Sequence, residues 1–169
     1  MLNQQFRRSF KCSCGGRGCL ESVASGPAIK QRAITEMKRG RHTLLVKILE
    51  QKGNLEAREV SDAALASDHA THDIFEEVRY YLAVALSSYL HIFQPTIIVL
   101  GGGVVQAGAL LLEPIRRTMK QLASPVYFTR LEDIKFSMLG TESGAIGAPS
   151  LIFFLVNIFI KDKRSLYAE

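Results

Sequence analysis

The stretch Cys12-Ser13-Cys14-Gly15-Gly16-Arg17-Gly18-Cys19-Leu20-Glu21 contains all three cysteines of the 169-residue chain. Successive cysteines are separated by two and five positions, with glycines between them. Glycine adopts the positive φ angles that a tight turn needs, and such a turn brings the sulfurs together at one point. A tetrahedral zinc ion requires this arrangement of thiolates. The spacing therefore predicts a zinc knuckle with Cys12, Cys14 and Cys19 as ligands.

A disulfide is the alternative interpretation of these cysteines, and a chance cluster of free thiols is another. Three cysteines leave one unpaired in any disulfide scheme. The first residues of the sequence have no pattern of a secretion signal, and we therefore expect a cytoplasmic protein in a reducing compartment. These points favour a reduced thiolate cluster, and the compact spacing argues against chance clustering.

Three stretches of the chain resemble one known family. Residues 12–29, CSCGGRGCLESVASGPAI, match the signature C-x-C-G-x-x-G-C-x-E of the ROK family, which is named for repressors, open reading frames and sugar kinases. Residues 94–105, QPTIIVLGGGVV, are similar to the family's strand and glycine turn beside the nucleotide. Residues 144–148, GAIGA, resemble the start of its closing helix. The resemblance extends from about Cys12 to Ala148.

The resemblance implies an α/β fold, the second lobe of an actin-like or ribonuclease-H-like sugar kinase with a zinc knuckle. ROK kinases begin with a first lobe that carries an Asp-x-Gly-x-Thr phosphate loop and a catalytic aspartate in an Asn-Asp pair, and neither pattern occurs in this sequence. We therefore expect the second half of a ROK protein, with no catalytic residue of its own and inactive as a kinase when alone. Residues 1–11 would be a lead-in, residues 12–148 the lobe, and residues 149–169 an apolar helix with a basic tail.

The resemblance also assigns roles to individual residues. Glu21 would accept hydrogen bonds from the hydroxyls of a sugar, whereas without the resemblance it is an ordinary carboxylate at a helix start. The zinc would be structural, and its fourth family ligand, a histidine ahead of the knuckle, is missing because no histidine precedes Cys12. His69 and His72, expected in a loop ahead of a helix, are weak candidates for a substitute. ATP with magnesium is the expected cosubstrate, and its contact would be the glycine triplet Gly101, Gly102 and Gly103.

Hydrophobic periodicity and capping residues predict the elements of the lobe. Apolar residues at helical spacing predict helices over Glu21–Arg39 in two pieces, Thr43–Gln51, Arg58–Ala66, from Asp73 to before Pro95, and from Glu113 onward. Ser25 is expected to cap the second helical piece, and Asp73 with Glu76 to form a capping box. The β-branched run Thr96–Leu100 predicts a strand buried on both faces of a parallel sheet, and Leu131–Leu139 predicts a second strand.

Length and composition agree with one globular domain. Hydrophobic residues make up 47% of the 169 positions, which suffices for a single buried core. The formal net charge is +5, but the basic residues are spread over the chain, so nucleic-acid binding is not favoured. The longest apolar run, Leu151–Ile160, is too short for a membrane span, which needs about 20 residues. We expect this run to be exposed and to support a homo-oligomer.

Three functions remain open from the sequence. The first is the second half of an ATP-dependent hexose kinase, glucokinase-like or fructokinase-like, which acts on a sugar and ATP. The second is the sugar-sensing half of a ROK repressor, whose DNA-binding segment would precede the first lobe. The third, an independent zinc module for nucleic acid, is the least favoured. The identity of the sugar does not follow from these residues.

Overall fold

The computed structural model describes residues 11–139, 142 and 144–153 of the chain. Its elements follow in the order α1 (Glu21–Ala24), α2 (Gly26–Lys38), α3 (Leu45–Lys52), α4 (Ala57–Leu65), α5 (His69–Phe93), β1 (Ile97–Leu100), η2 (Gly103–Leu110), α6 (Leu112–Leu122), α7 (Pro125–Phe128) and β2 (Asp133–Phe136). Residues 144–153 are also helical. This mixture of helices around parallel strands agrees with the expected α/β class.

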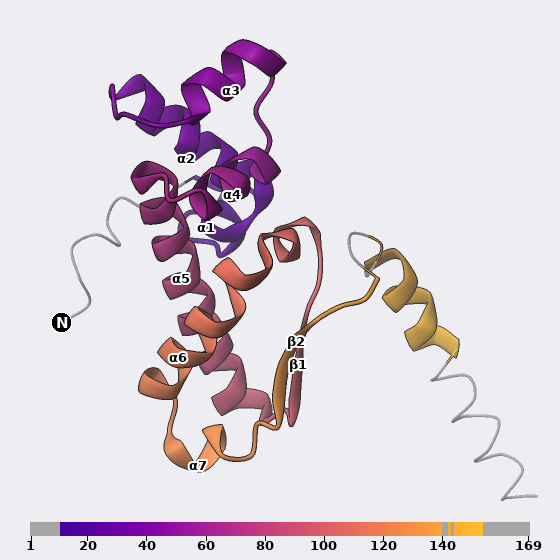
Figure 1. The fold of residues 1–169 in the computed structure, drawn as a ribbon. Helices are drawn as coiled ribbons and strands as arrows, with labels where there is room; N and C mark the ends of the chain where they lie inside the picture. Colours follow the sequence, from indigo (N-terminus) through magenta and orange to yellow (C-terminus); the bar gives the residue numbers. More distant parts are fainter. Residues whose placement is uncertain (1–10, 140–141, 143, 154–169) are drawn as a thin grey trace, which may run out of the picture.

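Helix α5 is the central element of the fold. It is 25 residues long and packs against α1, α2, α4 and α6 (Figure 1). Its inward face is apolar, and its fully or almost fully buried side chains include Ile74, Phe75, Val78, Ala83 and Leu90. With the buried Leu86 they define one helical face, on which Ile74 and Val78, Ala83 and Leu86, and Leu86 and Leu90 are three or four positions apart. The periodicity seen in the sequence is therefore confirmed as the core of the domain.

The start of α5 differs from the expectation. The N-cap is Asp68, whose Oδ1 accepts a hydrogen bond of 2.9 Å from the backbone N–H of Thr71. The predicted capping box of Asp73 and Glu76 is wrong, because both residues already lie inside the helix. His69 and His72 consequently occupy the first turns of α5 rather than a loop. Residues 69–73 are polar except for Ala70, which is why the sequence pattern placed the start of the helix too late.

The helices ahead of α5 follow their capping signals closely. Ser25 caps α2, since its hydroxyl accepts a 3.2 Å hydrogen bond from the N–H of Ala28. Gly40 and Gly53 follow α2 and α3 with φ angles of +74° and +68°, the left-handed conformation that glycine adopts without strain. Each glycine therefore lies where its helix ends.

The two strands pair in parallel, with Ile98 opposite Ile134 and Leu100 opposite Phe136. One face of this sheet is covered, and Ile134 there is 1% exposed. The other face is open, because Ile97 and Val99 are 42% and 55% exposed. The expectation of burial on both faces is therefore wrong for this chain. No described element packs over the outer face, and the β-branched composition of a strand cannot reveal whether a cover is present.

The connection from β1 to β2 contains a helix, as the sequence predicted. Strand β1 ends at the glycine triplet, and η2 with a kink at Gly108 leads into α6. Pro114 is the third residue of α6 rather than its first, because the helix already begins at Leu112. Strand β2 is shorter than the expected Leu131–Leu139.

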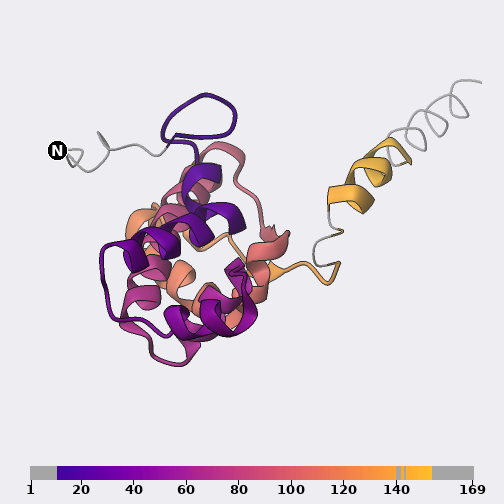
Figure 2. The same cartoon turned by 90° about the horizontal axis from the view of Figure 1, so that it is seen from above.

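The helical residues 144–153 stand apart from the body of the molecule in both ribbon views (Figures 1 and 2). Their large apolar side chains, Ile146, Leu151, Ile152 and Phe153, are exposed. The remainder of the expected apolar helix and the basic tail lie outside the described residues, as does nearly all of the expected lead-in. Among the described helices, none has the length and apolar content that crossing a membrane requires.

Candidate functional site: a three-cysteine knuckle ahead of a short helix

The knuckle is a tight reversal of the chain. The N–H of Cys12 donates to the carbonyl of Gly16 over 2.9 Å, and the N–H of Gly15 donates to the carbonyl of Cys12 over 3.0 Å. Lys11 and Arg17 form an isolated antiparallel bridge that closes the base of the reversal. Gly15 has a φ of +88°, where a side chain would strain the backbone. The glycines thus perform the role expected from the sequence.

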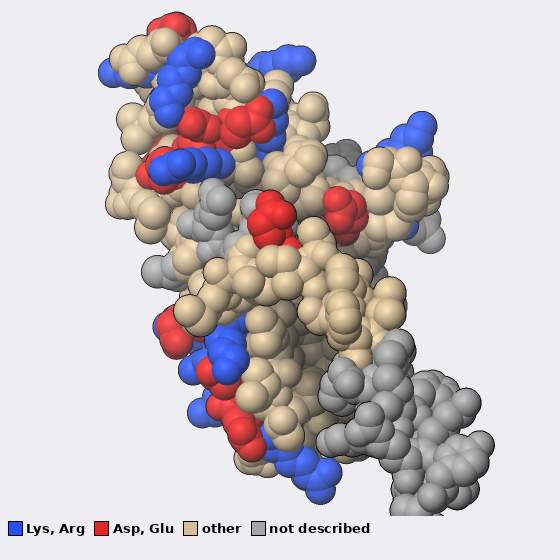
Figure 3. Space-filling model, turned by 90° about the vertical axis from the view of Figure 1, so that its right-hand side faces the viewer, with Lys and Arg blue, Asp and Glu red and all other residues tan. Residues whose placement is uncertain are grey.

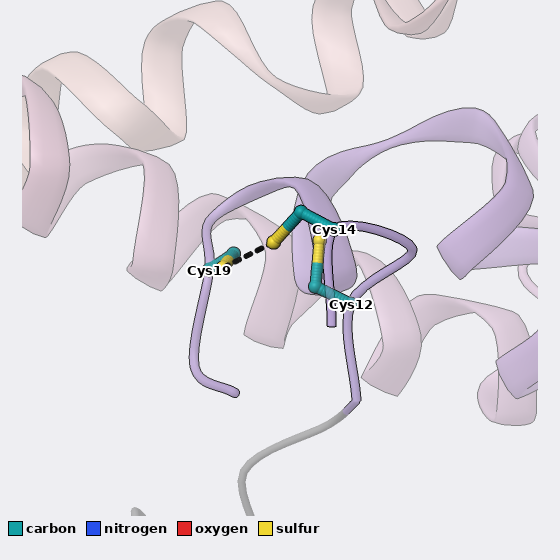
Figure 4. Close-up of side chains that lie close together, drawn as sticks. All are labelled: Cys12, Cys14 and Cys19. Carbon is teal, nitrogen blue, oxygen red and sulfur yellow. Dashed lines mark hydrogen bonds between the residues drawn. The ribbon is translucent and has the colours of Figure 1, made fainter. Parts of the chain in front are cut away.

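The reversal brings the three sulfurs together (Figure 4). All three Sγ atoms lie within 4.8 Å of one another, and the Sγ atoms of Cys14 and Cys19 are 3.7 Å apart. Tetrahedral zinc with Zn–S bonds of about 2.3 Å places its sulfur ligands roughly 3.8 Å apart. The cysteines are all free thiols. The donor set and its spacing therefore fit a metal ion, as the sequence predicted, whereas the identity of that metal stays a proposal.

Gly16 contributes to this geometry in a way that the sequence analysis missed. A Cβ atom at this position would lie 3.4 Å from the Sγ of Cys14 and 3.5 Å from the Sγ of Cys19. A longer side chain would therefore lie directly against both sulfurs. The signal in the sequence was the second glycine of the Gly-Gly pair, which the turn alone does not explain.

The pKa values of the Cys12 and Cys19 thiols are shifted in opposite directions. Hydrogen bonds from the backbone and thiol of Cys14 lower the pKa of Cys12. The pKa of Cys19 is raised to about 11, because its thiol hydrogen-bonds to Cys14 and Cys12 and because charge on their sulfurs opposes a further thiolate. Cys19 therefore retains its proton at neutral pH while no metal is bound. A divalent cation bound there would compete with the shared protons.

The fourth metal ligand is not found among the described residues. No histidine or carboxylate in the described part of the chain joins the three sulfurs within the same 4.8 Å. Residues 1–10 contain no histidine, cysteine or acidic residue. His72 instead lies in a separate exposed group with Asp73 and Glu76, in which Asp73 is paired with Arg41 at 2.8 Å. The structure therefore does not bring His72 to the knuckle.

Glu21 follows the knuckle directly as the first residue of α1, and it is exposed. The hydroxyl and the N–H of Ser22 both donate to the carbonyl of Cys19, over 2.7 and 3.0 Å. Val23 and Ala24 anchor the same short helix in the core. The backbone of Glu21 is therefore held by the knuckle on one side and by the core on the other, while its side chain is exposed. The role of Ser22 was not anticipated, although its place directly after Glu21 was visible.

The glycine triplet lies at the carboxyl end of β1, in a different part of the fold from the knuckle. Gly102 has a φ of +87°, and a Cβ at Gly102 or Gly103 would meet no atom within 4 Å. Open space therefore borders the backbone at this point. In open α/β sheets, ligands bind in the crevice beyond the carboxyl ends of the strands. The geometry is compatible with backbone approach to a ligand.

Comparison with known proteins decides the family. The sequence model of the ROK family matches residues 3–153. The chain belongs to the ROK family. The matched region contains the knuckle, Glu21 and the glycine triplet, so the resemblance carried by the three sequence motifs is confirmed.

Members of the ROK family with different functions are similar to this chain. The glucokinase of Thermotoga maritima is 35% identical over 141 residues, which are 83% of this chain and 44% of that protein. The crystal structure of a ROK family glucokinase from Streptomyces griseus, in complex with glucose and AMPPNP, aligns with a TM-score of 0.65 at 28% identity, covering 86% of this chain and 47% of the other. The structure of a ROK family transcriptional regulator, a homologue of the E. coli MLC protein, aligns with a TM-score of 0.67 at 27% identity. The alignment covers 79% of this chain and 33% of the regulator. The chain spans less than half the length of each.

Proposed function

We propose that this chain is the second half of a ROK sugar kinase, glucokinase-like or fructokinase-like, which transfers the terminal phosphoryl group of ATP to a hexose. The observation that carries the proposal is the placement of Glu21 directly behind three convergent thiols at the start of α1. The likeness to glucokinases supports it, since one of these was crystallised with glucose and AMPPNP. Glu21 would accept hydrogen bonds from sugar hydroxyls, because a carboxylate offers two acceptor oxygens.

Zinc is the metal that we propose for Cys12, Cys14 and Cys19. When bound to thiolates it would be structural, fixing the turn that precedes Glu21. The fourth position would be filled by water or by a residue outside the described part of the chain. In this scheme the three cysteines position Glu21 and take no part in the transfer itself.

For the nucleotide we propose Gly101, Gly102 and Gly103. The positive φ of Gly102 and the open space beside it would permit phosphate or ribose oxygens to approach the backbone. The chain would share ATP, its magnesium ion and the proton-accepting aspartate with the other half of the kinase, as the family resemblance implies. Phosphoryl transfer depends mainly on positioning and charge stabilisation, so neither half would suffice alone.

A hybrid enzyme tests this proposal. The chain would replace the matching second half of the Thermotoga maritima glucokinase, and sugar-dependent ADP release would be measured with glucose, mannose, fructose and N-acetylated hexosamines. We expect ADP release with at least one hexose. Glu21→Gln should lower kcat/KM about 10- to 100-fold, because a hydrogen bond to a charged group contributes about 1.5–3 kcal/mol. Glu50→Gln, a change at an exposed glutamate of α3, is the matched control. A folded, zinc-containing hybrid without activity toward any of these sugars would contradict the proposal.

The second candidate is the sugar-sensing half of a ROK transcriptional regulator. The structural likeness to the regulator homologous to the E. coli MLC protein favours it. The two candidates differ in what precedes this region of a complete protein. A helix-turn-helix segment encoded in frame upstream of Met1 would favour the regulator, whereas an Asp-x-Gly-x-Thr loop followed by an Asn-Asp pair, without such a segment, would favour the kinase.

A further inference from the structure

The three cysteines differ in exposure as well as in position. Cys14 is exposed, Cys19 is partly exposed, and Cys12 is buried with 7% of its surface accessible. The Sγ atoms of Cys14 and Cys19 are 3.7 Å apart and form a hydrogen bond between the two thiols (Figure 4). The nearest neighbour recorded for the Sγ of Cys12 outside the cluster is the Oγ of Ser13 at 3.9 Å. An oxidant in solution therefore reaches Cys14 first and finds Cys19 beside it.

The backbone between Cys14 and Cys19 is suited to closing this pair. A disulfide needs the sulfurs at about 2.05 Å, so they must approach by roughly 1.6 Å. Three of the four intervening residues are glycines, and Gly15 and Gly18 already hold positive φ angles of +88° and +74°. The side of Gly16 that faces the sulfurs carries no side chain to obstruct them. The loop therefore has the backbone freedom that closure of this pair requires.

We propose that Cys14 and Cys19 form a reversible redox pair, in which oxidation produces a Cys14–Cys19 disulfide and leaves Cys12 as a free thiol. With hydrogen peroxide as the oxidant, the Cys14 sulfur attacks the O–O bond and becomes a sulfenic acid, releasing one water. The Cys19 sulfur then displaces the sulfenic oxygen as a second water. The two thiols lose two electrons and two protons together, and peroxide accepts both. A dithiol reductant reverses the reaction by thiol–disulfide exchange.

Disulfide formation and metal binding exclude one another at this site. The disulfide would consume two of the three sulfur donors, and a metal bound to the thiolates would keep the same sulfurs from the oxidant. Oxidation would thereby also remove the metal that fixes the turn ahead of Glu21. This last consequence rests on the zinc site proposed above, whereas the pairing of Cys14 with Cys19 rests on the geometry alone.

The sequence provides a direct test of the pairing, because Arg17 lies between the two cysteines. Trypsin cleaves after Lys11, Arg17 and Lys30, so the pair would join peptide 12–17 to peptide 18–30. The 169-residue chain is freed of metal with a chelator, treated with hydrogen peroxide, blocked with iodoacetamide under denaturing conditions and digested without reduction. We expect the joined peptides, with the alkyl group on Cys12, and their separation after reduction.

Variants and added zinc complete the experiment. The joined peptides should be lost in Cys14→Ser and in Cys19→Ser and retained in Cys12→Ser, and zinc chloride added before the peroxide should suppress them. Fragmentation of the joined wild-type peptides locates the bond even if a variant fails to fold. A bond within peptide 12–17, a bond through Cys12 to peptide 18–30, or no bond at all would overturn the pairing. Equal yields of the joined peptides with and without zinc would contradict the proposed competition between disulfide formation and metal binding. That result would leave the proposed kinase function unaffected.

Discussion

Three cysteines within eight positions give this chain its most distinctive chemistry, and the structure confirms that their sulfurs converge. The convergence could be predicted because it depends on local backbone geometry, which the interleaved glycines permit. The fourth ligand could not be found in the same way, because it must come from outside the turn. The three sulfur ligands could therefore be predicted because they lie close in sequence, whereas a fourth ligand from a distant part of the chain could not.

The first prediction concerns the metal. The purified chain should bind zinc in an equimolar ratio, and a chelator should remove it more readily than from a site with four protein ligands, because one position is left to a labile ligand. Metal analysis of protein purified without added zinc, before and after chelator, measures this. Cys14→Ser should reduce the zinc content strongly, whereas Ser13→Ala should leave it unchanged. Zinc that withstands the chelator in the wild-type chain would show that a fourth protein ligand is present.

The second prediction concerns Asp68, which joins two segments. Its Oδ1 accepts from the N–H of Thr71 over 2.9 Å and its Oδ2 from the N–H of Leu44 over 2.6 Å. Burial raises the pKa of Asp68, but the hydrogen bonds from these N–H groups and from the hydroxyls of Thr43 and Thr71 outweigh it, and the pKa is lowered. The stabilisation is thus complete above the ordinary aspartate pKa of about 3.9 and is lost as pH falls through the lower folded-state value.

Denaturant unfolding at neutral pH and at about pH 3 tests the role of Asp68. Asp68→Ala should lower the free energy of unfolding by about 2 kcal/mol at neutral pH, because a helix cap is lost and the N–H of Leu44 loses its partner. Asp68→Asn keeps a capping oxygen but has no charge to titrate, so its stability should fall less than that of the wild type on acidification. If acidification lowered the free energy of unfolding equally in the wild type and in Asp68→Asn, the Asp68 carboxylate would not have the stabilising role described.

At the scale of elements, α5 determines how the other helices pack. The third prediction compares two aliphatic residues near its end, Leu90, which is fully buried, and Ile92, which is 68% exposed. Leu90→Ala should lower the free energy of unfolding by about 2–5 kcal/mol, because burial and packing are both lost. Ile92→Ala should change it by no more than about 0.5 kcal/mol. Equal losses for the two variants in denaturant titrations would mean that α5 is not packed as described.

The sequence predicted these elements unevenly, for physical reasons. Helices with a long apolar stripe or a clear cap were placed to within a few residues, as the Ser25 cap of α2 and the bounds of α3 show. The start of α5 was missed because its true cap, Asp68, precedes the mainly polar residues 69–73, in which Ala70 is the one apolar residue. The open face of β1 was missed for another reason. Burial of Ile97 and Val99 depends on whether another element packs over them, and the composition of the strand does not contain that information.

At the scale of the whole molecule, one side is unusually apolar. The outer face of β1 and the helical residues 144–153 lie on this side, and Figure 3 shows a broad area of uncharged residues below two acidic patches near its centre, with charged residues along the left and lower margins. The exposed large apolar side chains of these two segments are Ile97, Val99, Ile146, Leu151, Ile152 and Phe153. Apolar surface of this kind is typical of a face that meets another protein part.

The fourth prediction follows from this surface. The chain alone should self-associate at micromolar concentration, which sedimentation velocity measures. Replacing Leu151 and Phe153 together by serine should shift the distribution toward monomer, whereas Leu65→Ser, a change at an exposed leucine of α4, should not. A single monomeric species for the wild-type chain would contradict this prediction.

We propose that this chain contributes sugar and nucleotide contacts to a ROK kinase but cannot perform the transfer by itself. Loss of a general base alone lowers a rate about 10²- to 10⁴-fold, and loss of the opposing half also removes the alignment of ATP with the hydroxyl. The most direct measurement is a coupled assay of ADP release by the purified chain, with zinc, magnesium and ATP, against the same panel of hexoses as for the hybrid enzyme. We expect no sugar-dependent ADP release from the chain alone. Sugar-dependent release by the chain alone, abolished by Glu21→Ala, would contradict it.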